Sequence, residues 1–341
     1  MNQHAAQEIL AALRIADESP YSGEALSARL GVSRAQIWKH VSQLRRRGYQ
    51  IEGAPGGGYR LTGSPDRLYP EQIGPGLQTQ WLARTLHYLD ETDSTNEDAA
   101  RLAREGAPHG TAVIAEAQTA GRGRLGRDFY SPAYQNLYTS IVLRPTLETG
   151  RIPTLLLAAG LAVAQAVAET LGETAPIEIK WPNDVLIRGL KTSGVLMELE
   201  AEENRVTSAI LGIGVNLNTD PAEFPEEFRE SATSLASQLG QPVDRIRFTQ
   251  LLYSTLEEVI DRHAEAGLEG VRSQFEAFFR MRGRRVRVAG VDGGQFEGRA
   301  RGVADNGALE IETDSGQVVK VLAGDVTICK EGPNQESDRS E

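Results

Sequence analysis

Cysteine and histidine are scarce in this sequence of 341 residues, with Cys329 the single cysteine and five histidines in all. A single thiol cannot close a disulfide within the chain, so a disulfide-stabilised secreted domain is excluded. The sequence has no cluster of thiolates for a zinc site, and neither H-E-x-x-H nor H-x-E with paired cysteines occurs. Zinc chemistry and Ser-His-Asp chemistry therefore have little support.

Long hydrophobic runs are also missing. The longest apolar stretch, residues 155–164, ends at Gln165, whereas a membrane helix needs roughly 20 apolar residues. The first residues lack the charged and apolar regions of a secretory signal. We therefore expect a cytoplasmic protein with no membrane partner.

Positive charge is in deficit overall, with 36 Lys and Arg against 47 Asp and Glu and a net charge of −11. The deficit is uneven, because residues 1–60 carry eight basic and five acidic residues, a balance of +3. The rest of the chain carries 28 basic and 42 acidic residues, or −14. A basic N-terminal segment on an acidic body is expected if only that segment approaches a polyanion.

The first sixty residues have the pattern of three helices. Apolar residues recur at helical spacing over 9–13, and a second helix is predicted over 23–30 with Ser22 as its cap. Ser33 and Gln36 have the spacing of a capping box, in which each side chain satisfies a backbone N–H. A third helix is therefore predicted to begin directly after Ser33.

This third helix separates apolar from polar residues. Ile37, Val41 and Leu44 share one face. The opposite face is polar and cationic and carries no acid, and in a helix-turn-helix such a face can enter the major groove of DNA. The candidate DNA contacts at the start and along the outer side of this helix are Ser33, Arg34, Ala35, Gln36, Lys39, Ser42, Gln43 and Arg46.

A hairpin is predicted next, because runs at 49–52 and 59–61 flank a turn at 53–58 rich in Gly and Pro. This hairpin has the position of the wing in a winged helix. The alternative is a three-helix structural domain whose exposed face happens to be basic. The wing, the cap and the uneven charge together favour DNA binding.

Residues 62–80 are rich in Gly and Pro, which predicts a linker with at most a short helical turn. Strand-length and helix-length segments then alternate irregularly, and several strands are close enough for hairpins, so we expect an α+β domain with a mixed sheet covered by helices. The predicted strands are 86–89, 112–117, 137–143, 177–181, 185–187, 195–200 and 208–217, and the predicted helices are 97–105, 154–171, 246–266 and 271–279.

Residues 121–127, Gly-Arg-Gly-Arg-Leu-Gly-Arg, match G-x-G-x-x-G formally. A dinucleotide site needs a helix directly after the glycines, and residues 128–132, Asp-Phe-Tyr-Ser-Pro, do not open one, so we reject a Rossmann site. Glycine lets the backbone approach a ligand closely, and guanidinium groups suit phosphate and carboxylate oxygens. An anion-binding loop is predicted, with an ordinary surface loop or nonspecific nucleic-acid contact as the alternatives.

Two further elements carry cationic side chains. The run Lys-Trp-Pro-Asn-Asp at 180–184 ends an apolar strand, and a turn at 188–190 presents Lys191 before the next strand. A lone turn lysine is usually only solvated. Its neighbours make Lys191 a candidate anion contact.

Together these motifs resemble those of the biotin protein ligases, and with the winged helix those of the bifunctional biotin ligases that also repress biotin operons. The motifs stand in the family's order and span about 86–217, extended by the winged helix and a C-terminal segment. They are Asp-Ser-Thr-Asn at 93–96, Gln118 with 121–126, 180–184, Lys191 with Gly194, and Gly-Ile-Gly-Val-Asn at 212–216.

The resemblance implies a central fold like that of class II aminoacyl-tRNA synthetases and biotin ligases. It implies that biotin and ATP with Mg²⁺ form biotinyl-5′-AMP, and that the biotinyl group then passes to a lysine of biotin carboxyl carrier protein, a subunit of acetyl-CoA carboxylase. It also implies that the adenylate-bound protein forms a homodimer on operator DNA and represses biotin synthesis genes. Such a displacement depends on positioning and charge stabilisation, so no catalytic histidine is needed.

Carried over by position, the resemblance also implies roles for single residues. The catalytic residues would be Lys191, Arg122 and Arg124. The biotin site would comprise Ser94, Thr95, Asn96, Gln118, Arg122, Gly123, Arg124, Lys191 and Gly194. The ATP site would comprise Arg124, Phe129, Lys180, Asn183 and Asn216, and Asp184 would help to hold a metal ion. Taken alone, Thr95 with Asp98 could instead be a helix cap.

The sequence departs from the family at two loop positions, because relatives often have Arg where Leu125 stands and Trp where Phe129 stands. One loop charge is absent and the aromatic lid is smaller, so we expect weaker retention of the adenylate with less effect on its formation.

Short alternating runs at 284–288, 295–301, 308–311 and 318–321 predict a small barrel like an SH3 domain. The predicted division of the chain is a winged helix at 1–64, a linker at 65–83, a ligase domain at 84–280, an SH3-like domain at 281–330 and a disordered tail at 331–341.

Two alternative functions remain at this stage. One is a transcription factor that senses biotin without catalysis, against which Lys191 and the Arg/Gly loop argue. The other is a lipoate-type protein ligase on a related fold, which the biotin-type loop disfavours.

Overall fold

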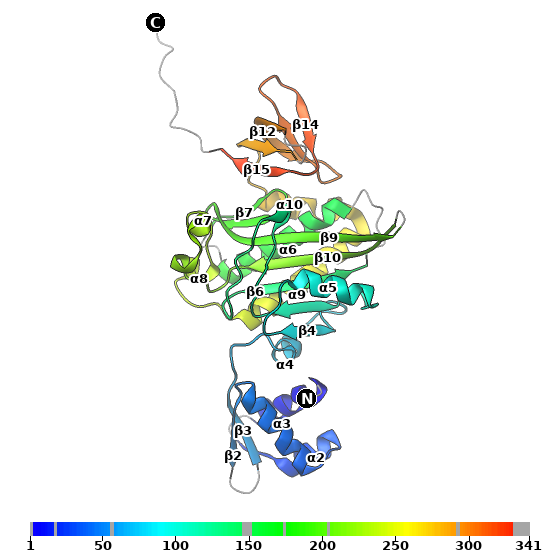
Figure 1. The fold of residues 1–341 in the computed structure, drawn as a ribbon, viewed down its shortest axis with the longest axis vertical. Helices are drawn as coiled ribbons and strands as arrows, with labels where there is room; N and C mark the ends of the chain where they lie inside the picture. The colour runs from blue at the N-terminus through cyan, green and yellow to red at the C-terminus, as the bar shows by residue number, and fades with distance from the viewer. Residues whose placement is uncertain are drawn as a thin grey trace.

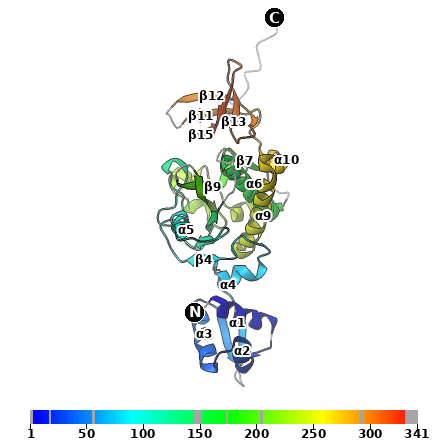
Figure 2. The same cartoon turned by 90° about the vertical axis from the view of Figure 1, so that its right-hand side faces the viewer.

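The computed structural model describes residues 3–16, 19–54, 58–144, 152–172, 175–202, 205–290 and 294–329. Three parts follow one another along an elongated molecule (Figure 1). The N-terminal part lies at one end, a large helix-covered sheet lies in the middle, and a small β-sheet lies at the other end (Figure 2). The predicted tail at 331–341 falls outside the described residues.

The N-terminal part contains the predicted helices α1 (Gln3–Ile15), α2 (Gly23–Leu30) and α3 (Arg34–Arg46). Strands β1 (Tyr21–Ser22), β2 (Gln50–Ala54) and β3 (Gly58–Gly63) form a sheet in the order β1-β3-β2. The β2/β3 hairpin is the predicted wing. This part has its own apolar core, to which α3 contributes the three predicted residues of its inner face.

Both predicted helix caps are present. The Ser22 hydroxyl accepts from the backbone N–H groups of Glu24 and Ala25 at the start of α2. Ser33 and Gln36 form the full capping box, with the Ser33 N–H donating to the Gln36 side chain at 2.9 Å and the Gln36 N–H donating to the Ser33 hydroxyl at 3.3 Å. The start of α3 is therefore encoded locally.

The predicted linker is packed rather than free. It contains the short helix α4 (Pro70–Ile73) and a 3₁₀ turn η1 (Gly74–Gly76), and Leu68, Tyr69 and Ile73 are buried. The Tyr69 ring lies 4.7 Å from the ring of Tyr88 in the central part, measured between centroids. The composition of the segment predicted its turns but not these contacts.

The central sheet has seven strands in the order β4-β5-β6-β10-β9-β8-β7. Strands β4 (Leu86–Leu89) and β5 (Ala112–Ala115) pair in parallel and the other neighbours pair antiparallel, so the predicted mixed sheet is confirmed. The remaining strands are β6 (Leu137–Leu143), β7 (Ile177–Lys180), β8 (Asp184–Ile187), β9 (Leu190–Glu202) and β10 (Arg205–Val215).

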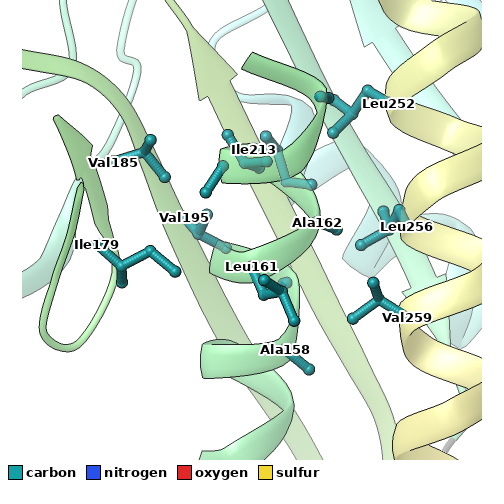
Figure 3. Packing of buried hydrophobic residues seen from close by; sticks show 14 of the residues in the cluster. Ala158, Leu161, Ala162, Ile179, Val185, Val195, Ile213, Leu252, Leu256 and Val259 are labelled. Atoms are coloured by element: carbon teal, nitrogen blue, oxygen red, sulfur yellow. The ribbon is translucent and has the colours of Figure 1, made fainter. Parts of the chain in front are cut away.

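Helices cover both faces of this sheet (Figure 2). Helix α5 (Thr95–Arg104) lies on one face, and α6 (Ile152–Leu171) and α9 (Arg245–Ala266) lie on the other. Ala158 and Leu161 of α6 face the sheet residue Val195, and Leu256 lies on the neighbouring α9 (Figure 3). Each fully buried leucine in this core contributes about 1.5–3 kcal/mol to folding.

Over Pro153–Leu171, α6 is long enough and apolar enough to cross a membrane. However, 72% of its apolar window is buried inside the protein. Its apolar composition is explained by its place in the core of the central part.

Smaller helices complete the central part. They are η2 (Arg124–Gly126), η5 (Pro221–Glu223), α7 (Glu226–Arg229), α8 (Leu235–Leu239), η6 (Gly267–Val271) and α10 (Arg272–Phe278).

The C-terminal part is an antiparallel sheet of five strands in the order β14-β13-β12-β11-β15. Four strands were predicted, namely β11 (Arg285–Ala289), β12 (Gln295–Val303), β13 (Leu309–Glu312) and β14 (Val318–Val321). The fifth, β15 (Asp325–Ile328), was missed because four residues are too short a run to predict a strand, although they alternate between polar and apolar side chains. It pairs with β11, which is distant in sequence.

Candidate active site

A cavity of about 720 Å³ opens on the central sheet, and its lining reaches β15 of the C-terminal part. Every residue that the sequence assigned to catalysis, biotin, ATP or metal lines this one cavity. Segments that are far apart in sequence supply them, namely the start of α5, the stretch from Gln118 through the Arg/Gly loop to Phe129, the 180–184 run, the start of β9, and the residue that follows β10.

Neutral hydrogen-bonding groups form one end of the cavity. The Gln118 side-chain oxygen accepts from the Thr95 N–H at 2.9 Å and from the Thr95 hydroxyl at 3.1 Å. The Gln118 amide donates to Ser131 at 3.0 Å, and Ser140 donates to Thr95 at 2.7 Å. Ser94 is the N-cap of α5 but makes no side-chain cap bond. These contacts argue against the simple cap interpretation of Thr95.

Asn96 also belongs to this end of the cavity, and its position explains why residue 212 is glycine. Its amide donates to Glu198 at 2.6 Å and its carbonyl accepts from Ser140 at 2.6 Å. A Cβ at Gly212 of β10 would collide with the Asn96 carboxamide. Glycine at this position therefore lets α5 approach the sheet.

The Arg/Gly loop supplies five lining residues of the cavity, namely Arg122, Gly123, Arg124, Leu125 and Arg127. Its turn is closed by the Gly123 N–H, which donates to the Arg127 carbonyl at 2.7 Å. A Cβ at Gly121 would lie 2.6 Å from the Phe129 carbonyl oxygen, so the loop needs glycine there. Leu125 holds the left-handed conformation with φ of 57° and is exposed.

Each arginine of the loop has a protein partner. Arg122 pairs with Glu97 of α5 at the surface. Arg124 donates to the Asn183 side chain at 3.3 Å and to the Gly324 carbonyl at 3.4 Å. Burial lowers the pKa of Arg124, and the carboxylates of Asp184 and Asp325 oppose this effect. A half-buried cation beside a cavity is a ready contact for an anion.

Lys191 lies within β9 instead of in the preceding turn, and this corrects the sequence interpretation. The backbone turns at Arg188 and Gly189, where φ is 53° and 80°, and β9 begins at Leu190. The Lys191 ammonium lies 2.8 Å from a carboxylate oxygen of Asp184, whose side chain is 17% exposed. A strand holds the ammonium more firmly than a turn would.

This ion pair bears on the predicted metal site. Within the described ranges, no group of three or more His, Cys, Asp or Glu residues could hold a metal ion. Asp184 instead points its carboxylate at Lys191. The described residues therefore do not build a resident metal site by themselves.

The floor of the cavity is a pair of glycines on adjacent strands. Gly194 of β9 is in register with Gly214 of β10, and the ring of Phe129 rests on them. A Cβ at Gly214 would lie 2.6 Å from two ring carbons of Phe129. Phe129, the aromatic residue expected over the nucleotide, thus packs against these two glycines.

Polar groups line the other end. Asn183 donates to the Val195 carbonyl at 2.9 Å, and Asn216 donates to the Thr233 carbonyl at 3.2 Å. Lys180, the last residue of β7, lines the cavity beside them.

The C-terminal part contributes lining residues that the sequence analysis missed, namely Arg284, Asp325, Thr327, Ile328 and Cys329. Arg127 of the loop pairs with Asp325 at 2.6 Å, and Arg284 pairs with Glu178 of β7 at 2.9 Å. No local pattern marks these residues, because their place depends on the docking of the small sheet.

A second candidate site is the outer face of α3. Arg34, Ala35, Lys39 and Arg46 are exposed there, and Ser42 and Gln43 are partly buried. Ser33 and Gln36 are exposed, but their side chains are bound to each other in the capping box. Trp38, which the sequence analysis overlooked, is 59% exposed on this helix.

Three family models match the chain. The Biotin/lipoate A/B protein ligase family matches residues 88–216, an HTH domain matches 6–60, and the Biotin protein ligase C terminal domain matches 283–328.

Curated relatives match over most of their length. The bifunctional ligase/repressor BirA of Bacillus subtilis is 38% identical over 90% of this chain and 93% of the relative. BirA of Escherichia coli is 32% identical over 90% of this chain and 92% of the relative.

A solved structure of biotin protein ligase from Aquifex aeolicus with biotin and ATP is 32% identical to this chain. It covers 73% of this chain and 100% of its own length with a TM-score of 0.63.

Proposed function

The chain belongs to the family of bifunctional biotin ligases and repressors, and from this premise we propose how its residues carry out both activities. The protein ligates biotin to protein with ATP and acts as a repressor. Its substrates are biotin and ATP. The observation that carries the proposed mechanism is a single cavity with a neutral hydrogen-bonding end and a cationic centre.

The neutral end suits the ureido ring of biotin. A ureido group offers N–H donors and a carbonyl acceptor, so hydroxyl and amide partners match it and ionic partners do not. Ser94, Thr95, Asn96 and Gln118 supply such groups. Gly123 and Gly194 leave room for the backbone to approach the ligand.

The cationic centre brings two anions together. At 4 Å and an effective dielectric constant of 20, two unit negative charges repel by about 4 kcal/mol, so cations must offset this before the biotin carboxylate can reach the α-phosphate. Arg122, Arg124 and Lys191 supply this charge. The Arg122–Glu97 pair is about half exposed on both sides, and such surface pairs are weak enough to be exchanged for a ligand.

The far end takes the nucleotide. Lys180 and Arg124 face the phosphates, and Asn183, Asn216 and the Phe129 ring contact the rest of ATP. We treat Mg²⁺ as part of the MgATP substrate, because Mg²⁺ commonly binds through substrate phosphates and keeps several waters. Asp184 then orients Lys191 through their ion pair.

The reaction has two displacements. A biotin carboxylate oxygen bonds to the α-phosphorus and pyrophosphate leaves, which gives biotinyl-5′-AMP. The neutral amine of a lysine on biotin carboxyl carrier protein then bonds to the acyl carbon and AMP leaves. Both steps are accelerated chiefly by held geometry and fixed positive charge.

For repression, α3 enters the major groove of operator DNA and the β2/β3 wing lies beside it. We propose that the adenylate-bound protein forms a homodimer through the central sheet and then binds a palindromic operator of biotin synthesis genes. Sedimentation with and without biotin and ATP tests the dimer. We propose that the protein acts in the cytoplasm, because ATP, the carrier protein and operator DNA occur together there.

The domain limits proposed are 1–64, 84–280 and 281–330, with 65–83 as the connecting segment. The small antiparallel sheet reaches the nucleotide end of the cavity, which accounts for a C-terminal domain in the enzyme.

One experiment tests the enzymatic assignment. The protein is incubated with biotin, MgATP and a biotin carrier domain, and adenylate and biotinylated carrier are measured separately. Both should form. Adenylate without transfer would favour a biotin sensor, and activity with lipoate in place of biotin would favour the lipoate-type ligase.

A further inference from the structure

Arg245, the first residue of α9, is fully buried without being part of the cavity lining. Its partner Glu116, which directly follows the short strand β5, is fully buried as well. Burying an ion pair carries a desolvation cost that good geometry only partly offsets. Such a pair is therefore poorly explained as a device for stability alone.

All three nitrogens of the guanidinium have partners. Nη1 donates to the Glu116 carboxylate at 2.8 Å and to the Asn136 carbonyl at 3.2 Å. Nε donates to the Asp66 carboxylate at 3.1 Å, and Nη2 donates to the Asp66 carbonyl at 2.9 Å. One planar group thus joins three segments that are separate in sequence.

The first segment leads to the biotin end of the cavity. The Tyr134 N–H donates to the Glu116 carbonyl at 3.2 Å, so this backbone is held on both sides. Two residues further on, Gln118 binds Thr95. A shift of Glu116 would therefore move Gln118.

The second segment leads to the nucleotide end. The Asn136 side-chain oxygen accepts from the Leu217 N–H at 2.9 Å and from the Asn218 N–H at 3.3 Å. These residues directly follow Asn216. Holding the backbone of Asn136 therefore holds the end of β10 that presents Asn216.

The third segment is the connecting segment that follows the winged helix. Asp66 is 62% exposed, and two residues later the Leu68 N–H donates to the other Glu116 carboxylate oxygen at 2.8 Å. The connecting segment therefore contacts both members of the buried ion pair, Arg245 through Asp66 and Glu116 through Leu68.

We propose that Arg245 is a positioning residue, which sets the biotin end and the nucleotide end of the cavity at their working separation and uses the connecting segment as its third support. This inference rests on the proposed function, because it concerns the same cavity. Arg245 touches no substrate and acts through Glu116 and Asn136.

The test is Arg245→Lys in the full chain. Lysine keeps the buried charge, but its donors all lie on one nitrogen, so it cannot span the three segments that the planar guanidinium reaches with three nitrogens. The matched control is Arg144→Lys, because the guanidinium of Arg144, which directly follows β6, donates to the backbone carbonyls of Ala103, Ala107 and Thr207, none of which lines the cavity.

The measurements are calorimetric Kd for biotin, KM for biotin and ATP in ATP–pyrophosphate exchange, and melting temperature. Arg245→Lys should raise the Kd and both KM values about tenfold, and kcat should change much less. Arg144→Lys should lower the melting temperature without moving these constants. Unchanged binding constants in Arg245→Lys, with only a lower melting temperature, would overturn the proposal.

A second variant covers the case in which Arg245→Lys does not fold. Glu116→Gln keeps the side-chain shape and removes the ion pair, and it should raise the same constants. Wild-type constants in Glu116→Gln would also overturn the proposal. Wild-type protein that binds biotin but catalyses no exchange would refute the ligase mechanism, while the calorimetric Kd of the variants would still decide the role of Arg245.

Discussion

Lys191 and Asp184 illustrate how single side chains set the chemistry of the cavity. The ammonium is held by one carboxylate at 2.8 Å and by its place in β9, so its charge is fixed before substrates bind. Preorganised charge of this kind stabilises a transition state without a cost of reorganisation.

We predict that Lys191→Ala abolishes biotin-dependent ATP–pyrophosphate exchange, with a loss of at least about 10²- to 10³-fold. The fold should persist, because Lys191 is partly exposed. Circular dichroism checks the fold, and radiolabelled pyrophosphate measures the exchange. Lys320→Ala is the control, since Lys320 forms a surface pair with Glu310 in the C-terminal sheet. Near-normal exchange in Lys191→Ala would remove Lys191 from its proposed role.

The floor of the cavity needs glycine because a larger side chain there would collide with the Phe129 ring. We predict that Gly214→Ala weakens ATP binding about tenfold, because the new methyl group would lie 2.6 Å from the Phe129 ring and displace it. Calorimetric titration with ATP measures the effect. Gly160→Ala makes the same change in α6 with no atom within 4 Å of the new Cβ, so it should leave ATP binding unchanged. Equal affinities for both variants would contradict this account of the floor.

At the scale of elements, two side chains, Ser33 and Gln36, determine where α3 begins. Three buried side chains, Ile37, Val41 and Leu44, determine which face of the helix packs inward. The capping box defines its first turn, and its inner residues belong to the core of the N-terminal part. Its cationic face is left to solvent and to DNA.

We predict that Ser33→Ala lowers the stability of the N-terminal part by about 1 kcal/mol, because the Gln36 N–H loses its acceptor. Urea unfolding followed by circular dichroism measures the change. Ser42→Ala is the same substitution inside α3, where alanine is a better helix former. It should not destabilise. Equal losses for both variants would show that the cap contributes nothing specific.

Arg46→Ala should weaken DNA binding and lower the slope of log K against log salt by about one, if the guanidinium neutralises one phosphate. Gel shifts with a duplex from the control region of a biotin synthesis gene, at several salt concentrations, measure the slope. Arg14→Ala, at the end of α1, provides an exposed arginine outside this face. A slope unchanged from wild type would leave Arg46 without a phosphate contact.

At the scale of the whole molecule, the cavity is completed by parts that fold around different cores. Asp325 of the C-terminal sheet pairs with Arg127 of the loop, and Asp66 near the winged helix pairs with Arg245 behind the cavity. Among the residues that the structure describes, none of the lining comes from the winged helix.

Removal of residues 1–64 should therefore abolish operator binding and preserve at least part of the biotinylation activity. The truncated chain keeps Asp66 and Leu68 and so keeps the contacts of Arg245 and Glu116. Gel shift and carrier biotinylation, each compared with the full chain, measure the two activities. An unchanged gel shift would refute the winged-helix assignment.

Much of the architecture could be predicted because it is encoded locally. The capping box, the inner face of α3 and most strands of the central sheet follow from spacing within a few residues, and the structure places them within a few positions of the prediction. The exception is β9, which begins at Leu190 and thereby takes Lys191 out of the predicted turn.

The sequence by itself determined the kinds of element and the residue types of the site, since periodicity, caps and motifs act over short stretches of chain. Tertiary structure alone decided that Asp325 meets Arg127 and that Arg245 joins three segments. The first contact spans 198 residues and the bonds from Arg245 to Asp66 span 179. Contacts across such separations exist only once the sheets have packed, so no local pattern records them.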